Sequence, residues 1–504
     1  MRMMKNFSLV TTFLILMMIS FVNVDAKELN GSIGGLNLDD DAKLVGDVVL
    51  SKELFVASDK NITLDLNGHT ISVPSTVSGY GINNKGTLKI IDSSNGGSIV
   101  CENSGSSCVA NSGKMEVRNV KVSSKDIALK NEPIASLTVT NSNISSTYAR
   151  SDAGAIFNYG TLLIENSTVT CTGTYSVAIM GSVGSDNGVS TTSKTTIKNS
   201  TISANSAINI ATGTGDEVYV YDSTLNGGFG PRLTSKFEVH GKISTSKLSD
   251  KLLLGAVDGT VITLTKSSSF TTVTSDSVDL KEGVVLNIKD NVALNLKKVK
   301  INIKGIMRLG KGASVSVSST GSINSAVYNA TQNVYYGSVT AATSEMVDGD
   351  VLKFNSADVV SSVNSSLYDV VLNDDGEYVV KYKDADYSKV NEAIAKAKKI
   401  DKNLYTSDSY SNLKRAINKV ITGKDITEQN LVDSYASDIN GAIDNLVLLE
   451  KSTTNNTIAK DSDASNNIVN PQTYDGIEKW VILALISLGG IILTIVYRKK
   501  IKAN

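Results

Sequence analysis

The side chains that could perform acid–base or metal chemistry in this 504-residue chain are few and far apart. Cleavage of a polysaccharide needs paired carboxylates at a set separation, or an acidic cluster that holds calcium beside an Arg or Lys base. The charged residues expected to face outward in the first half of the chain include no recurring acidic pair; they are Asp65, Asp92, Glu116, Glu165 and Asp222. The arginines with no acidic cluster near them in sequence are interpreted as solvated; they are Arg118, Arg150 and Arg232.

The two histidines give no further indication of catalysis. His69 belongs to the turn "LNGH", where a structural role is favoured, and His240 follows "KFEV" with no partner in sequence. We therefore predict no catalytic, cofactor-binding or metal-binding residues. Stacking could still bring distant residues together, so an enzyme stays open as an alternative.

The middle of the chain repeats itself every 22 to 33 residues. Each copy alternates apolar residues and then carries Asn or Asp; the copies are "LTVTNSNIS" (137–145), "LLIENSTVT" (162–170), "TTIKNSTIS" (195–203), "VYVYDSTLN" (218–226) and, more loosely, "MEVRNVKVS" (115–123). This alternation favours short strands with one buried face, and such coils bury that face by stacking as a parallel β-solenoid. The recurring residues Asn119, Asn141, Asn166, Asn199 and Asp222 should stack at one corner, where side-chain hydrogen bonds satisfy the turns.

The opening "ITLDLNGHTIS" (62–72) and the strand-like "VGDVVLSKEL" upstream have counterparts further along, at "DGTVITL" (258–264), "VVLNIKDNVALNL" (284–296) and "VKINIKG" (299–305). Over about 40–330 the chain resembles the pectin-lyase-like right-handed β-helix of bacterial surface proteins. The resemblance implies a β-helix over 27–245 and a second run of coils over 246–335. It specifies fold better than function, because lyases and hydrolases also use this scaffold.

Between 336 and 384 short strands continue without a repeat, and their fold is not predicted. From 387 the period becomes helical, with three apolar stripes that begin at Tyr387, Tyr410 and Leu431, and Asp425 or Thr427 can cap the third helix. Residues 385–450 therefore predict a small three-helix bundle. The segment resembles a FIVAR domain of Gram-positive surface proteins, which implies a spacer or a glycan- or matrix-binding module.

Both ends of the chain predict export and attachment. Arg2 and Lys5 precede an apolar stretch and a small-residue site, which indicates a cleaved signal peptide over 1–26. Residues 451–469 are polar and predict a flexible tether. The apolar run 479–497 is long enough for a transmembrane helix, with Trp480 at one interface and a basic tail at the other that includes Arg498, Lys499 and Lys500.

The peptide "NPQT" precedes this run and could carry chemistry by itself. Peptide, apolar span and basic tail stand in the order of a sortase sorting signal, and Asn470, Pro471, Gln472 and Thr473 resemble its NPQT form. The resemblance implies that sortase cuts after Thr473 and joins its carbonyl to the cell-wall peptidoglycan. Tyr474 and Asp475 stand where commoner forms carry Gly, which leaves the sortase class open.

Composition excludes some partners. With 49 basic and 50 acidic residues, nothing points to nucleic acid. Of the three cysteines, Cys101 and Cys108 could close one loop. We expect a mainly β, surface-displayed and wall-anchored protein that binds glycans or host and matrix proteins, as an adhesin does. The alternatives are a polysaccharide lyase or glycoside hydrolase on the same scaffold, and a structural spacer.

Overall fold

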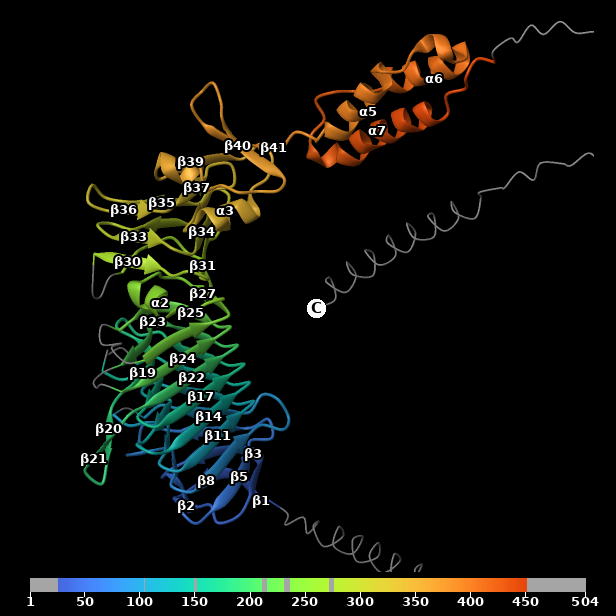
Figure 1. Ribbon diagram of the computed structural model, residues 1–504. Helices are drawn as coiled ribbons and strands as arrows, with labels where there is room; N and C mark the ends of the chain where they lie inside the picture. Colours follow the sequence, from blue (N-terminus) through green and yellow to red (C-terminus); the bar gives the residue numbers. More distant parts are fainter. Residues whose placement is uncertain are drawn as a thin grey trace, which may run out of the picture.

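The computed structural model describes residues 26–450 except 104, 149–151, 211–214, 231–235 and 272–275, and only the backbone of 189, 357 and 358. The predicted signal peptide, tether, sorting motif and apolar run lie almost entirely outside these residues. Within them the chain is mainly β and forms a β-solenoid of about 12 turns, which confirms that prediction (Figure 1). No helix in this part of the chain is long and apolar enough to cross a membrane.

Three columns of parallel strands build the solenoid. Column A contains β5 (Asn61–Asp65), β8 (Thr87–Ile91), β11 (Lys114–Arg118), β14 (Ser136–Thr140), β17 (Thr161–Glu165), β22 (Lys194–Lys198), β24 (Glu217–Tyr221) and β26 (Lys236–His240). Column B contains β2 (Leu36–Asn37), β4 (Leu54–Val56), β7 (Ile82–Asn84), β10 (Val109–Asn111), β13 (Leu129–Asn131), β16 (Ile156–Asn158) and β19 (Val177–Gly181).

Column C continues through both halves of the solenoid. It contains β6 (Thr70–Val73), β9 (Ser98–Cys101), β12 (Lys121–Ser124), β15 (Asn143–Ser146), β18 (Thr168–Cys171), β23 (Thr201–Ile210), β25 (Thr224–Phe229), β27 (Lys242–Thr245), β28 (Val261–Leu264), β31 (Val285–Ile288) and β34 (Ile306–Leu309). The strands β1 (Lys27–Ile33) and β3 (Ala42–Leu50) begin the stack, because β3 pairs with both β5 and β6.

The later coils complete their turns with two small sheets. One contains β29 (Ser268–Ser269), β32 (Ala293–Asn295) and β35 (Ser314–Ser316); the other contains β30 (Ser277–Leu280), β33 (Lys300–Ile303) and β36 (Ser322–Asn324). Helix α2 (Asp250–Gly255) lies where the coils change, and β20 (Gly184–Asp186) and β21 (Val189–Thr191) form a hairpin insertion. Alternate residues point inward and form one core cluster from Leu29 to Met307.

The corner between columns A and C differs from the predicted asparagine ladder. Its residues do stack, but they serve as turn residues with left-handed backbone, with φ of 44° to 60° at Asn119, Asn141, Asn166, Asn199 and Asp222. Asparagine and aspartate tolerate this conformation better than other residues with a Cβ. After Asn166 and Asn199 the side-chain hydrogen bond comes from the next residue instead: the Ser167 Oγ accepts from the Ser142 N–H at 3.0 Å, and the Ser200 Oγ from the Ser167 N–H at 3.0 Å.

The side-chain amide ladder lies at the corner between columns B and A. Asn84, Asn111, Asn131 and Asn158 are all buried and follow one another in the pairing register. Each Nδ2 donates to the Oδ1 of the next, at 2.7, 2.8 and 2.8 Å. These asparagines include those of the Asn-x-Gly turns, and their Oδ1 atoms also accept the N–H two residues on, as at Gly86 and Gly160.

Beyond β34 the sheet becomes antiparallel and forms a cap on column C. The cap contains β37 (Val327–Asn329), β38 (Val334–Tyr336), β39 (Val351–Phe354), β40 (Tyr368–Leu372), β41 (Tyr378–Tyr382), α3 (Val339–Glu345) and α4 (Ala357–Val360). It has its own apolar cluster around Tyr336 and Leu352. The small β region over 336–384 thus acquires a fold that its sequence did not predict.

Three helices follow: α5 (Ser388–Lys398), α6 (Ser407–Asn418) and α7 (Gln429–Asp444), with the 3-10 helices η1 (Lys402–Leu404) and η2 (Ile426–Glu428). They share an apolar cluster that includes Val390, Leu413 and Ile439. Asp425 caps η2 by accepting from the Thr427 N–H at 2.8 Å, and neither residue caps α7, whose N-cap is Glu428.

Candidate functional site

The carboxylates singled out in the sequence do not form an acid–base pair. Asp92 is buried at 3% exposure, not outward as expected. Burial alone would raise its pKa, but the N–H groups of Gly97 and Gly68, both at 2.7 Å, hold the pKa of Asp92 below its usual value. Asp65 accepts from the Ser93 hydroxyl at 2.7 Å, and Asp222 from the Lys242 N–H at 2.9 Å. These groups stabilise turns.

The remaining charged residues are also accounted for locally. Arg118 is exposed, as expected, and its Nε lies 3.4 Å from the Glu116 carboxylate on the same strand. Glu165 lies two coils further along column A. Arg150 and Arg232 lie outside the described residues. In the part of the chain that is described, no group of three His, Cys, Asp or Glu side chains could hold a metal ion.

Both histidines have structural partners. His69 Nδ1 lies 3.6 Å from the Asp47 carboxylate. His240 was expected to have no partner, but it stacks on Tyr221 with ring centroids 4.5 Å apart and lies 3.3 Å from Glu238. Because Tyr221 and His240 are directly paired on the adjacent strands β24 and β26, this contact is a cross-strand ring pair that stabilises the sheet.

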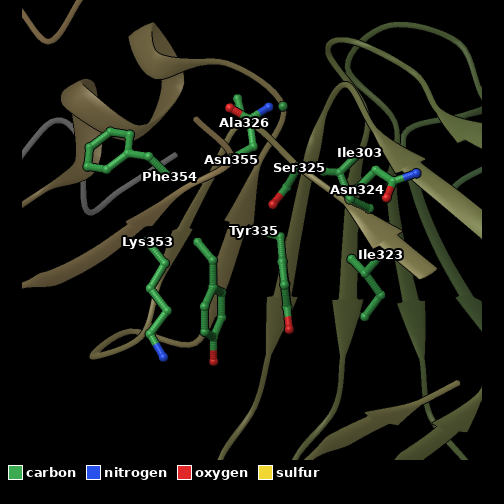
Figure 2. A pocket seen from close by; sticks show the side chains of 11 residues that line it. Ile303, Ile323, Asn324, Ser325, Ala326, Tyr335, Lys353, Phe354 and Asn355 are labelled. Atoms are coloured by element: carbon green, nitrogen blue, oxygen red, sulfur yellow. The ribbon is translucent and has the colours of Figure 1, made fainter. Parts of the chain in front are cut away.

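A cavity lies where the solenoid meets its cap, and we call it the end cleft (Figure 2). It has a volume of about 570 Å³ and receives side chains from β33, β36, β37, β38 and β39. Its lining consists of Ile303, Ile323, Asn324, Ser325, Ala326, Tyr328, Tyr335, Gly337, Lys353, Phe354 and Asn355. This volume is within the range of sites for small molecules or single sugar rings.

A tyrosine forms one wall of the end cleft. Tyr328 and Tyr335 face each other across β37 and β38 and stack with centroids 4.3 Å apart. Figure 2 shows Tyr335 and Ile323 extending in the same direction on opposite sides of a gap, with Lys353 on the side of Tyr335 away from Ile323. Burial raises the pKa of Tyr335, and the neighbouring Tyr328 adds to this. One side of the Tyr335 ring is therefore occupied by Tyr328, and the other borders the cleft.

Polar groups lie at the rim. Asn324 continues an outward row with Asp279 and Asn302, in which Asn324 Nδ2 donates to Asn302 Oδ1 at 2.9 Å and Asn302 Nδ2 to Asp279 at 2.8 Å. Lys353 and Asn355 are exposed. The residues that line the cleft include no Asp, Glu or His; its aromatic, amide and lysine side chains can stack and can donate and accept hydrogen bonds.

A hydrogen-bonded network behind the cleft holds the cap on the solenoid. Arg308 of β34 contacts both carboxylate oxygens of Glu345 of α3, at 2.6 and 2.7 Å, and the Tyr336 hydroxyl donates to Glu345 at 2.9 Å. Partial burial opposes the charge on Glu345, but Arg308 and Tyr336 hold its pKa below the usual value. Burial and the adjacent Glu345 raise the pKa of Tyr336. The wall that carries Tyr335 is thereby fixed.

Sequence reasoning did not identify the end cleft. Its residues come from four segments between 303 and 355, and the only local signal is the aromatic pair in "NVYYG". The sorting residues Asn470–Thr473 and the retention residues Trp480, Arg498, Lys499 and Lys500 lie outside the described residues. The fold and cleft define a capped β-solenoid protein. No family model, curated protein or solved structure matches the chain.

Proposed function

We propose that this chain is a binding protein displayed on the cell envelope, and that it holds a glycan or a host protein in the end cleft. The observation that carries the proposal is the slot between the free side of Tyr335 and Ile323, with Asn324 and Lys353 at its rim. Aromatic faces bind the apolar faces of sugars and protein side chains, and amide groups orient them. The lining lacks the paired carboxylates that glycoside hydrolysis needs, which favours binding over hydrolysis.

The proposal of display rests on the ends of the sequence. The first 26 residues direct export, and the tether over 451–469 leads to the motif Asn470–Thr473. Sortase joins Thr473 to peptidoglycan, while the apolar run over 479–497 and the basic tail hold the precursor at the membrane. Proline at 471 favours an extended peptide, a shape that suits entry into an enzyme cleft.

The finer assignments of the domains belong to the same proposal. We take the solenoid to be a right-handed, pectin-lyase-like β-helix and residues 385–450 to be a FIVAR-like three-helix bundle. The shared apolar cluster of α5, α6 and α7 supports a bundle that spaces the solenoid from the wall. The bundle and the tether would then hold the end cleft away from the wall, and the solenoid would extend beyond the cleft.

Binding is tested with glycan and matrix-protein arrays probed with the full chain and with two tyrosine variants. Tyr335→Ala removes the wall of the cleft, whereas Tyr221→Ala removes a stacked tyrosine on column A, outside the cleft. We expect Tyr335→Ala to abolish a signal that Tyr221→Ala retains. Equal loss in both variants, or a signal insensitive to both, would refute binding in the end cleft. Turnover of an array glycan would favour the alternative of a polysaccharide lyase or hydrolase.

Attachment is tested separately on intact cells. Cell walls are digested with muramidase, and the mass of the C-terminal peptide of the released protein is measured. A peptide that ends at Thr473 and carries the mass of a wall stem peptide is expected. Recovery of an intact tail through Asn504 in the membrane fraction would show a membrane-tethered protein and exclude sorting.

A further inference from the structure

The end of the solenoid that carries the end cleft is only partly capped. In column C the last strand, β34, is covered because β38 pairs with it. The other two strands of the final coil, β35 and β36, pair only with β32 and β33 below them in the described chain. Each of these two sheets therefore ends in an edge strand among the described residues, and both edge strands lie at the end of the solenoid next to the cap (Figure 1).

The geometry of β36 shows which backbone groups lie on this free edge. The N–H of Ser322 donates to Val299 one coil below, at 3.3 Å, and Ser322 pairs with Lys300. Because successive residues of a strand direct their backbone groups to opposite sides, the N–H and C=O of Ile323 point away from β33. Ile323 thus offers one donor and one acceptor at the edge, and its side chain lines the end cleft.

The side chains beside this edge complete the site. Ile323 and Val315 are inward residues of the last coil, yet they are only partly buried, since no further coil covers them. Asn324 donates its Nδ2 to Asn302, and among the described residues no donor reaches its Oδ1. A strand placed on β36 would bury Ile323, fill the slot beside Tyr335 and find an acceptor at Asn324.

The charge around the edge indicates the kind of strand that fits. Between residues 291 and 344 the chain has six cationic side chains and no carboxylate. Arg308 is paired with Glu345 and Lys304 with Asp279, but Lys300 on β33 and Lys353 at the cleft are exposed, and no described carboxylate pairs with either. Lysines near an edge also discourage pairing with other sheets, so they select against neutral or basic strands.

We propose that the end cleft and the edge of β36 bind an acidic, extended polypeptide segment by strand addition. The bound strand runs parallel to β36 and places an apolar side chain between Ile323 and Tyr335. The residue before it stands above Ser322 and is acidic; the residue after it stands above Asn324 and is a side-chain donor such as asparagine. This inference rests on the proposed function, since it names the ligand class of the same cleft, and backbone pairing combined with a side-chain pocket is how strand addition achieves selectivity.

The test uses the full chain and a fluorescein-labelled peptide, Glu-Thr-Glu-Ile-Asn-Thr-Glu, with binding read by fluorescence polarisation. In the proposed register the peptide Asn N–H donates to the Ile323 C=O, whereas the N–H of the peptide Ile faces away. N-methylation at Asn should weaken binding at least about tenfold, because it removes one hydrogen bond and adds a clash. N-methylation at Ile is the matched control and should leave binding unchanged.

Two protein variants test the remaining contacts. Tyr335→Ala should abolish binding of the peptide, and Lys300→Gln should weaken it and reduce its dependence on salt; Lys194→Gln, on column A, is the control for charge. Equal affinity for the two N-methylated peptides would overturn the proposal. Binding of an array glycan, but of no acidic peptide, with loss in Tyr335→Ala would overturn strand addition and leave the proposed function standing. Binding of neither a glycan nor an acidic peptide would refute both strand addition and the proposed function. Self-association of the chain through the edge of β36 would show that the added strand comes from a second copy of the chain and would overturn the acidic peptide as its ligand.

Discussion

Replacement of Asn131 by alanine should destabilise the solenoid much more than an ordinary loss of one polar side chain. Asn131 is fully buried; its Nδ2 donates to Asn158 Oδ1 at 2.8 Å and to the Thr161 C=O at 3.0 Å, and its Oδ1 accepts from Asn111 at 2.8 Å. The variant leaves Asn158 Oδ1, the Thr161 C=O and Asn111 Nδ2 each short of one partner. At about 1–3 kcal/mol for each unsatisfied buried group, partly offset by the remaining contacts of Asn111, we expect a loss of about 2–4 kcal/mol.

The loss is measured as the change in free energy of opening of individual amides by native-state hydrogen exchange, since repeat proteins open locally. The matched control is Asn143→Ala, which removes an exposed asparagine of β15 and should change the free energy by no more than about 0.5 kcal/mol. The effect of Asn131→Ala should be largest for amides of β10, β13 and β16. A change no larger than that of the control would refute the inference that the inward amide ladder stabilises the coils.

Three further predictions follow from contacts elsewhere. Cys101 and Cys108 form a disulfide, so alkylation of the denatured, unreduced chain should label neither cysteine; labelling before reduction would contradict the bond. Reduction of this disulfide opens the loop and should lower the free energy of unfolding by about 2 kcal/mol. Because the pKa of Asp92 is lower in the folded chain than in the unfolded chain, the contribution of Asp92 to the free energy of unfolding is complete above about pH 4 and is lost as the pH falls through the folded pKa. Urea unfolding at several pH values should show this decrease in stability in the native chain and a smaller decrease in Asp92→Asn. Arg308→Met should destabilise the cap by about 1–2 kcal/mol, since the ion pair of Arg308 with Glu345 is about one-third exposed. Unchanged hydrogen exchange of the cap amides in this variant would refute the role of the ion pair in holding the cap.

The solenoid could be predicted because the alternation of apolar and polar residues that specifies each coil is local and recurs along the chain. Residues such as Leu137, Val139, Leu162 and Ile164 alternate with outward residues, and a shift of one position would expose every apolar side chain. The roles of the asparagines were less accessible. Asn141 and Asn131 both precede turns, but one provides a left-handed backbone and the other a buried amide, and only the register of the stacked coils separates these roles.

The cap and the end cleft could not be predicted for a different reason. The strands β37 to β41 are short, do not repeat and pair in an antiparallel arrangement that depends on the last parallel coil. Tyr335 and Ile323 are near each other in sequence, but Phe354 and Ile303 join them only through tertiary pairing. His240 shows the same limitation, because Tyr221 becomes its neighbour through the stacking of β24 on β26.

The most direct test of binding in the end cleft is hydrogen exchange of the full chain with and without the strongest ligand found on the arrays. We predict new protection of amides over 322–337 and 351–355, with little change in columns A and B or in α5, α6 and α7. Protection confined to the side faces of the solenoid or to these helices, with none over 322–337, would contradict it.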